Sequence, residues 1–175
     1  FSLLYFGHDE KKIHILNGGL KKWIFENKPT TKDKTEIIES NYVASEKENL
    51  VVSFDQIKKN ILSKSFNVID ARSLERFEGK VSEPRKGLRS GHIQNSFCLP
   101  FNQCINQKTG EFKNLEELRE LFNQNENIEK RLDQVFTCGS GVTAAVLAYA
   151  YKMVNNDYIP KIYDGSWSEY GKYPA

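Results

Sequence analysis

A chain of 175 residues with a hydrophobic fraction of 39% is long enough for one packed domain and an appendage. A formal net charge of +2 points to neither a nucleic acid nor a membrane surface as partner, and the apolar runs are too short to span a bilayer. Three cysteines without a CxxC pair argue against a disulfide framework and favour a reducing compartment, either the cytoplasm or, in a eukaryote, the mitochondrial matrix.

The opening segment is expected to contain short elements only. The predicted elements are the end of an apolar helix at Phe1–Phe6 stopped by Gly7, a strand at Ile13–Leu16 and a helix at Leu20–Phe25. Because the chain does not begin with methionine, we expect the natural N-terminus to be absent.

This segment resembles the end of the chain. ILNGGLKKW, from Ile15 to Trp23, aligns without a gap with IYDGSWSEY, from Ile162 to Tyr170. A unit present once whole and once as a tail indicates a two-domain protein whose first copy lacks its front part. We therefore predict a remnant of the first domain at 1–28, a polar linker at 29–50 and a whole second domain at 51–175.

The second domain shows short apolar strands that alternate with helices. The strands are expected at 67–70, 96–100, 135–137 and 162–164, and the helices at 53–62, 74–77, 115–122, after Cys138 and at 167–170. This alternation predicts the α/β class, with a central, mostly parallel sheet and helices on both of its faces. Ligands of such sheets bind beyond the carboxyl ends of the strands, where Asp70 and Cys138 stand.

Cys138 lies between a buried strand and an apolar helix, within residues 135–153. A thiol in that loop is surrounded by backbone N–H groups at the positive end of a helix dipole. Both features favour the thiolate, which is the nucleophilic form of cysteine. We interpret Cys138 as a catalytic sulfur; the alternative is a buried structural cysteine at a strand end.

CGSGVT, from Cys138 to Thr143, resembles the active-site loop of the 3-mercaptopyruvate sulfurtransferases of the rhodanese family. Further motifs match in order and spacing: DARSLERFEG (70–79), EPRKGLRSGHI (83–93), LPF (99–101) and YDGSW (163–167). NGGLKKW resembles the close of the family's non-catalytic N-terminal domain. The resemblance implies a rhodanese-like fold, with the catalytic domain at 51–175 and a non-catalytic remnant at 1–28.

The resemblance also implies a double displacement without cofactor or metal. Cys138 takes sulfur from 3-mercaptopyruvate as a persulfide, pyruvate leaves, and the sulfur passes to cyanide or to a thiol such as thioredoxin or a small thiol. The loop amides would hold the persulfide: Gly139, Ser140, Gly141, Val142 and Thr143. Ser140 is assigned acid or relay duty for the leaving enolate, against the alternative of a small polar loop filler.

Two arginines complete the site that the resemblance implies. Arg76 and Arg85 would bind the donor, because a guanidinium suits a carboxylate. Asp70 is expected to support the site, by orienting an arginine or capping backbone N–H groups. His92 is expected to bond backbone and fix a turn. Cys98 is expected to be buried and inert, and Cys104, after a Pro-Phe turn, to be exposed.

The loop sequence also bears on rival functions. In thiosulfate-preferring members of the family the loop resembles CRKGVT, with two cationic side chains after the cysteine. Gly139 and Ser140 stand at those two positions in this chain. The loss of both cations favours mercaptopyruvate as donor and leaves a secondary thiosulfate activity open. A phosphatase would need CX5R, whereas Ala144 holds the sixth position and no arginine occurs at 139–153. A non-catalytic persulfide carrier remains an alternative.

Overall fold

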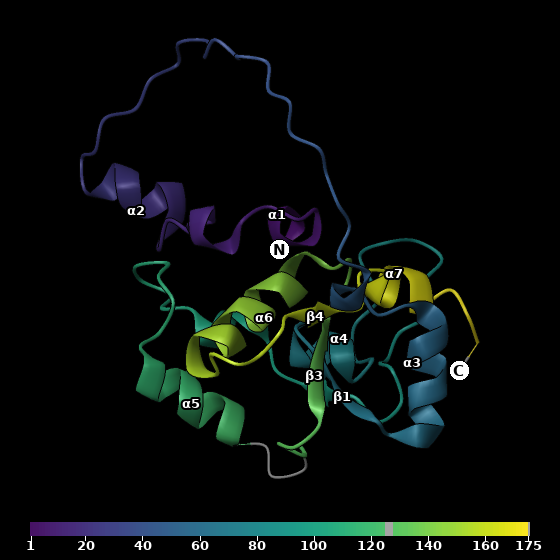
Figure 1. The fold of residues 1–175 in the computed structure, drawn as a ribbon. Helices are drawn as coiled ribbons and strands as arrows, with labels where there is room; N and C mark the ends of the chain where they lie inside the picture. Colours follow the sequence, from purple (N-terminus) through teal and green to yellow (C-terminus); the bar gives the residue numbers. More distant parts are fainter. Residues whose placement is uncertain (125–127, 175) are drawn as a thin grey trace.

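The computed structural model describes residues 1–124 and 128–174 (Figure 1). Residues 125–127 and 175, which the predicted second domain includes, lie outside this description. The described residues form a four-stranded parallel sheet in the order β2–β1–β3–β4. Its strands are β1 (Phe66–Asp70), β2 (Phe97–Cys98), β3 (Asp133–Thr137) and β4 (Lys161–Ile162). The predicted α/β class and parallel sheet are confirmed.

The helices of this domain follow the sequence signals closely. They are α3 (Phe54–Ser63), α4 (Leu74–Phe77), α5 (Leu115–Asn123), α6 (Val142–Val154) and α7 (Ser166–Tyr170), with 3₁₀ turns η2 (Glu48–Leu50) and η3 (Phe101–Cys104). Helices α3 and α5 begin with complete capping boxes, in which Ser53 or Asn114 accepts from the backbone three residues on. These caps pair N–H groups that have no partner inside the helix, which explains why both starts could be read from sequence.

Alternate residues of the central strands pack into two separate cores. Ile69 and Phe136 belong to a cluster with side chains of α5 and α6. Val68 and Val135 belong to a cluster with Ile57 of α3 and the aromatic residues of α7. Because successive side chains of a strand point to opposite faces, helices cover both faces, as predicted.

The N-terminal segment contains α1 (Ser2–Tyr5), η1 (Glu10–Lys12) and α2 (Gly19–Phe25). Gly7 has φ +82°, which confirms it as the end of the first helix. The prediction of a strand at Ile13–Leu16 was wrong: this stretch is irregular, because no described strand runs beside it to pair its backbone. Residues 29–47 are exposed and follow a wide arc, as Figure 1 shows.

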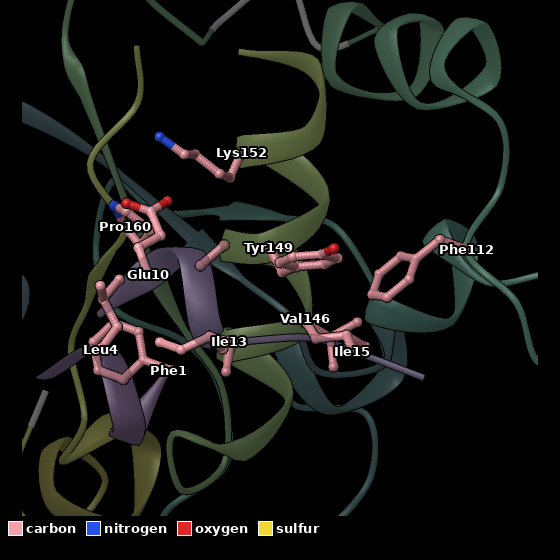
Figure 2. A pocket seen from close by; sticks show the side chains of 12 residues that line it. Phe1, Leu4, Glu10, Ile13, Ile15, Phe112, Val146, Tyr149, Lys152 and Pro160 are labelled. Carbon is pink, nitrogen blue, oxygen red and sulfur yellow. The ribbon is translucent and has the colours of Figure 1, made fainter. Parts of the chain in front are cut away.

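An apolar cavity of about 480 Å³ lies between this segment and α6 (Figure 2). Ile13 and Ile15 form one wall, and Val146 and Tyr149 of α6 form the other. Ile13 and Ile15, which were expected to lie in a strand, therefore line a cavity beside a helix instead. No helix in the described part of the chain is long and apolar enough to cross a membrane.

Candidate active site

Cys138 stands at the carboxyl end of β3, directly before the loop that starts α6. Its Sγ accepts a hydrogen bond from the Ser140 backbone N–H at 3.4 Å, and the residue is only 2% exposed. Gly141 caps α6 with φ +80°, a left-handed conformation that suits glycine. The 13-residue helix α6 therefore directs its N-terminus toward the loop that carries the thiol.

The other loop amides do not all face the sulfur. The Gly141 N–H donates to Ser166 Oγ at 3.0 Å, and the Cys138 N–H donates to the same oxygen at 3.1 Å. Gly141 therefore serves the loop as a helix cap and anchor. The Ser140 hydroxyl makes no hydrogen bond to any described residue, and Ser140 is partly exposed.

Arg76 and Arg85 meet at the loop beside Gly139. A Cβ atom on Gly139 would lie 3.0 Å from Arg76 Nη2 and 3.6 Å from Arg85 Nη1. Arg76 comes from α4, and Arg85 comes from the loop after it. The absence of a side chain at position 139 thus lets two guanidinium groups approach the residue after the thiol. The predicted site residues Cys138, Arg76 and Arg85 are gathered in one place.

Asp70 supports the arginine that sequence reasoning missed. Its carboxylate accepts from the Arg72 backbone N–H at 3.0 Å and from Arg72 Nη2 at 2.7 Å. Arg72 has a fully buried side chain and also donates from Nη1 to Glu83 at 2.9 Å, while its guanidinium lies 4.5 Å from the Trp167 ring. Asp70 therefore accepts both from the side chain of an arginine and from the backbone N–H of the same residue.

Ser166 is the second residue that was not singled out. Besides accepting from the two loop amides, its hydroxyl donates to the Tyr163 carbonyl at 2.8 Å. The backbone N–H groups of Trp167 and Ser168 donate to the carbonyls of Cys138 and Gly139, each at 2.9 Å. The first turn of α7 therefore anchors the thiol loop. The only sequence signal was a Gly-Ser turn directly after a strand.

Replacing Ser166 with alanine is expected to destabilise the protein by about 2–6 kcal/mol. Two buried amides would lose their acceptor, and each unpaired buried donor costs about 1–3 kcal/mol. Urea unfolding measures the loss, with Ser90→Ala as an exposed control that changes stability by less than about 0.5 kcal/mol. A Ser166→Ala variant as stable as its parent would contradict the anchoring role.

The surroundings of His92, Cys98 and Cys104 indicate structural roles for these three residues. His92 Nδ1 lies 2.8 Å from the Phe77 carbonyl and its ring stacks on Phe77 at 4.0 Å, which confirms the expected backbone bond. Cys98 is partly buried, and burial raises the pKa of its thiol to about 12. The prediction that Cys104 is exposed was wrong: it is fully buried, because η3 packs into the core against α6, and burial raises its pKa to about 12.

These features define a class of protein: an α/β domain with a cysteine thiol held at a strand end, in a backbone loop that two arginines approach. The profile of the Rhodanese-like domain matches residues 53–173, and the chain belongs to the rhodanese family. Residues 53–173 contain all of the site residues described above.

Individual relatives agree with this assignment. The chain is 36% identical to 3-mercaptopyruvate sulfurtransferase of Homo sapiens over 165 residues. This alignment covers 94% of this chain and 54% of the relative. Thiosulfate sulfurtransferase of Gallus gallus is also 36% identical over 165 residues, with 94% and 55% covered. The chain thus spans about half the length of these curated relatives.

Solved structures share the fold. The 3-mercaptopyruvate sulfotransferase SseA of Escherichia coli superposes with a TM-score of 0.79 at 31% identity, over 95% of this chain and 60% of that chain. The Tum1 protein of Saccharomyces cerevisiae superposes with a TM-score of 0.83 at 25% identity, over 97% of this chain and 60% of that chain.

Proposed function

We propose that this domain is a sulfurtransferase that takes sulfur from 3-mercaptopyruvate through a persulfide on Cys138. The observation that carries the proposal is the meeting of Arg76 and Arg85 beside Gly139, next to the thiol. Two guanidinium groups beside the residue that follows the thiol suit the carboxylate and keto oxygen of a small α-keto acid. The similarity to 3-mercaptopyruvate sulfurtransferase of Homo sapiens supports the same donor.

In the first half of the reaction, the Cys138 thiolate attacks the donor's sulfur. The new S–S bond forms as the donor's C–S bond breaks, and the electron pair of that bond passes to carbon as the enolate of pyruvate. One proton then converts the enolate to pyruvate. Ser140 directly follows the residue after the thiol, its backbone N–H donates to Cys138 Sγ, and its hydroxyl has no hydrogen-bond partner among the described residues, so we assign that hydroxyl the delivery of the proton.

In the second half, an acceptor thiolate or cyanide attacks the outer sulfur of the persulfide and regenerates the Cys138 thiolate. Until then, the outer sulfur needs N–H donors. The backbone N–H of Ser140 already donates to Cys138 Sγ. The Gly141 N–H is not free for this role, because it donates to Ser166 Oγ. We therefore propose that the remaining donors of the cradle are the backbone N–H groups of Gly139, Val142 and Thr143. Three unpaired cysteines favour a reducing compartment, with thioredoxin or a small thiol as acceptor.

Thiosulfate is the second candidate donor. It is favoured by a relative named thiosulfate sulfurtransferase that is as similar to this chain as the mercaptopyruvate enzyme is. Gly139 and Ser140 offer no cation to a doubly charged donor, so we expect thiosulfate to be the slower substrate.

Steady-state release of pyruvate from 3-mercaptopyruvate, in the presence of a thiol, tests the proposal. Repeated turnover is expected. A single equivalent of pyruvate per protein, without turnover when acceptor is in excess, would instead indicate a persulfide carrier.

Replacing Arg76 or Arg85 with glutamine is expected to raise KM for 3-mercaptopyruvate about tenfold or more. Either change removes a charge-assisted bond to the donor, and such bonds are worth about 1.5–3 kcal/mol. Initial-rate kinetics measure the change, with the exposed neighbour Lys86→Gln as a matched control. An unchanged KM in both arginine variants would argue against their role in donor binding.

A further inference from the structure

Glu83 is a buried carboxylate that the reaction above does not use. Its side chain is only 1% exposed. Its Oε1 accepts from Arg72 Nη1 at 2.9 Å and from Arg76 Nε at 3.2 Å, and its Oε2 accepts from Arg76 Nη2 at 2.6 Å. Because Arg72 is bound in turn to Asp70 at the end of β1, Glu83 connects Arg76 to the central sheet.

This contact fixes the orientation of Arg76. The guanidinium uses Nε and Nη2 for Glu83, and its Nη1 and Nη2 lie 3.8 and 3.0 Å from the position of a Cβ on Gly139. A two-point bond between a planar guanidinium and a carboxylate restrains the plane of the group as well as its distance. Arg76 therefore presents a fixed edge to the thiol loop, although it stands on a short helix at the surface.

The same contact limits the positive charge at the loop. Asp70 balances Arg72, and Glu83 balances Arg76, whereas Arg85 has no acidic partner among the described residues. On the other side of the loop, the carboxylate of Asp164 lies against Gly141. An entrance with such nearly balanced charges suits a donor with one negative charge better than a donor with two.

We propose that Glu83 is a positioning and specificity-determining residue: it holds Arg76 toward the thiol loop and limits the positive charge there, which favours singly charged donors. As a statement about donors, this rests on the proposed function. The part of the proposal that concerns the electrostatic potential at Cys138 can be tested without any sulfur transfer.

The test compares the alkylation of Cys138 by iodoacetate, which is anionic, and by iodoacetamide, which is neutral. Glu83→Gln removes one negative charge and retains an oxygen that can accept from both arginines. The ratio of the iodoacetate rate to the iodoacetamide rate is expected to rise about fivefold. Peptide mass spectrometry follows Cys138 separately from Cys98 and Cys104, the pKa values of whose thiols are raised by burial.

Two further variants separate charge from structure. Glu83→Asp keeps the charge but shortens the reach, so the alkylation ratio should stay at its parental value while KM for 3-mercaptopyruvate rises. Glu78→Gln makes the same charge change at an exposed residue that pairs with Lys80, and it should leave both quantities unchanged. Thermal unfolding of each variant sets an assay temperature at which all are folded.

The donors give the second measurement. In Glu83→Gln, the ratio of kcat/KM for thiosulfate to kcat/KM for 3-mercaptopyruvate is expected to rise by a similar factor. An alkylation ratio that does not rise in Glu83→Gln, or that rises equally in Glu83→Asp, would overturn the proposal. If the alkylation ratio rises but no donor is turned over, the inference about the field stands and the proposed function fails.

Discussion

Replacing Cys138 with serine is expected to abolish sulfur transfer, with a loss in kcat of at least about 10³-fold. A hydroxyl is far less nucleophilic than a thiolate at neutral pH, and the pathway has no other group to carry the sulfur. Serine fits the same loop, so the fold should persist. Pyruvate release and acceptor-dependent turnover measure the loss, and circular dichroism verifies that the variant is folded.

The matched control is Cys98→Ser. Cys98 is a partly buried thiol whose pKa is raised to about 12 by burial, and its Sγ lies 3.7 Å from the Arg72 carbonyl. This variant should retain its parent's turnover, because a protonated thiol in that position takes no part in the reaction. Full activity in Cys138→Ser would remove the basis of the proposed mechanism.

Replacing Arg72 with methionine is expected to destabilise the protein by about 3–5 kcal/mol. The change leaves the buried carboxylates of Asp70 and Glu83 without their shared cation, and removing one member of a buried ion pair typically has a cost of that size. It also removes the guanidinium that lies against the Trp167 ring. Urea unfolding measures the loss, with the exposed Arg131→Met as control.

A double variant identifies the cause. Asp70→Asn together with Arg72→Met removes both charges of one pair, so its loss should be smaller than the sum of the two single losses. Additive losses would mean that the Asp70–Arg72 pair is not the source of the stability, and that packing of the arginine side chain accounts for it.

Much of the fold could be predicted from sequence because its signals are local. The capping residues Ser53 and Asn114 stand three residues before their partners, and the strand before Cys138 is a short apolar run. The stretch Ile13–Leu16 shows the limit of such signals. Its composition suits a strand, but strand formation also depends on a neighbour to pair with.

The position of Cys138 in the candidate site could be predicted because a cysteine between a buried strand and an apolar helix is a typical nucleophile position. Arg76 and Arg85 could be predicted only from the resemblance to the family. The supporting residues of the site were missed because their roles depend on side-chain contacts between different elements and loops. Ser166 binds the loop from 28 residues away, and Glu83 bridges two arginines that precede it in the chain. Only the fold shows which serine is buried against the thiol loop and which glutamate is buried against the arginines.

The central claim is that Cys138 carries sulfur as a persulfide. Mass spectrometry of the protein after brief exposure to 3-mercaptopyruvate without acceptor, followed by peptide mapping, tests it directly. We predict one added sulfur atom on the peptide that contains Cys138, lost again when a thiol acceptor is added. An unmodified Cys138, or a sulfur atom found on Cys98 or Cys104 instead, would contradict the account.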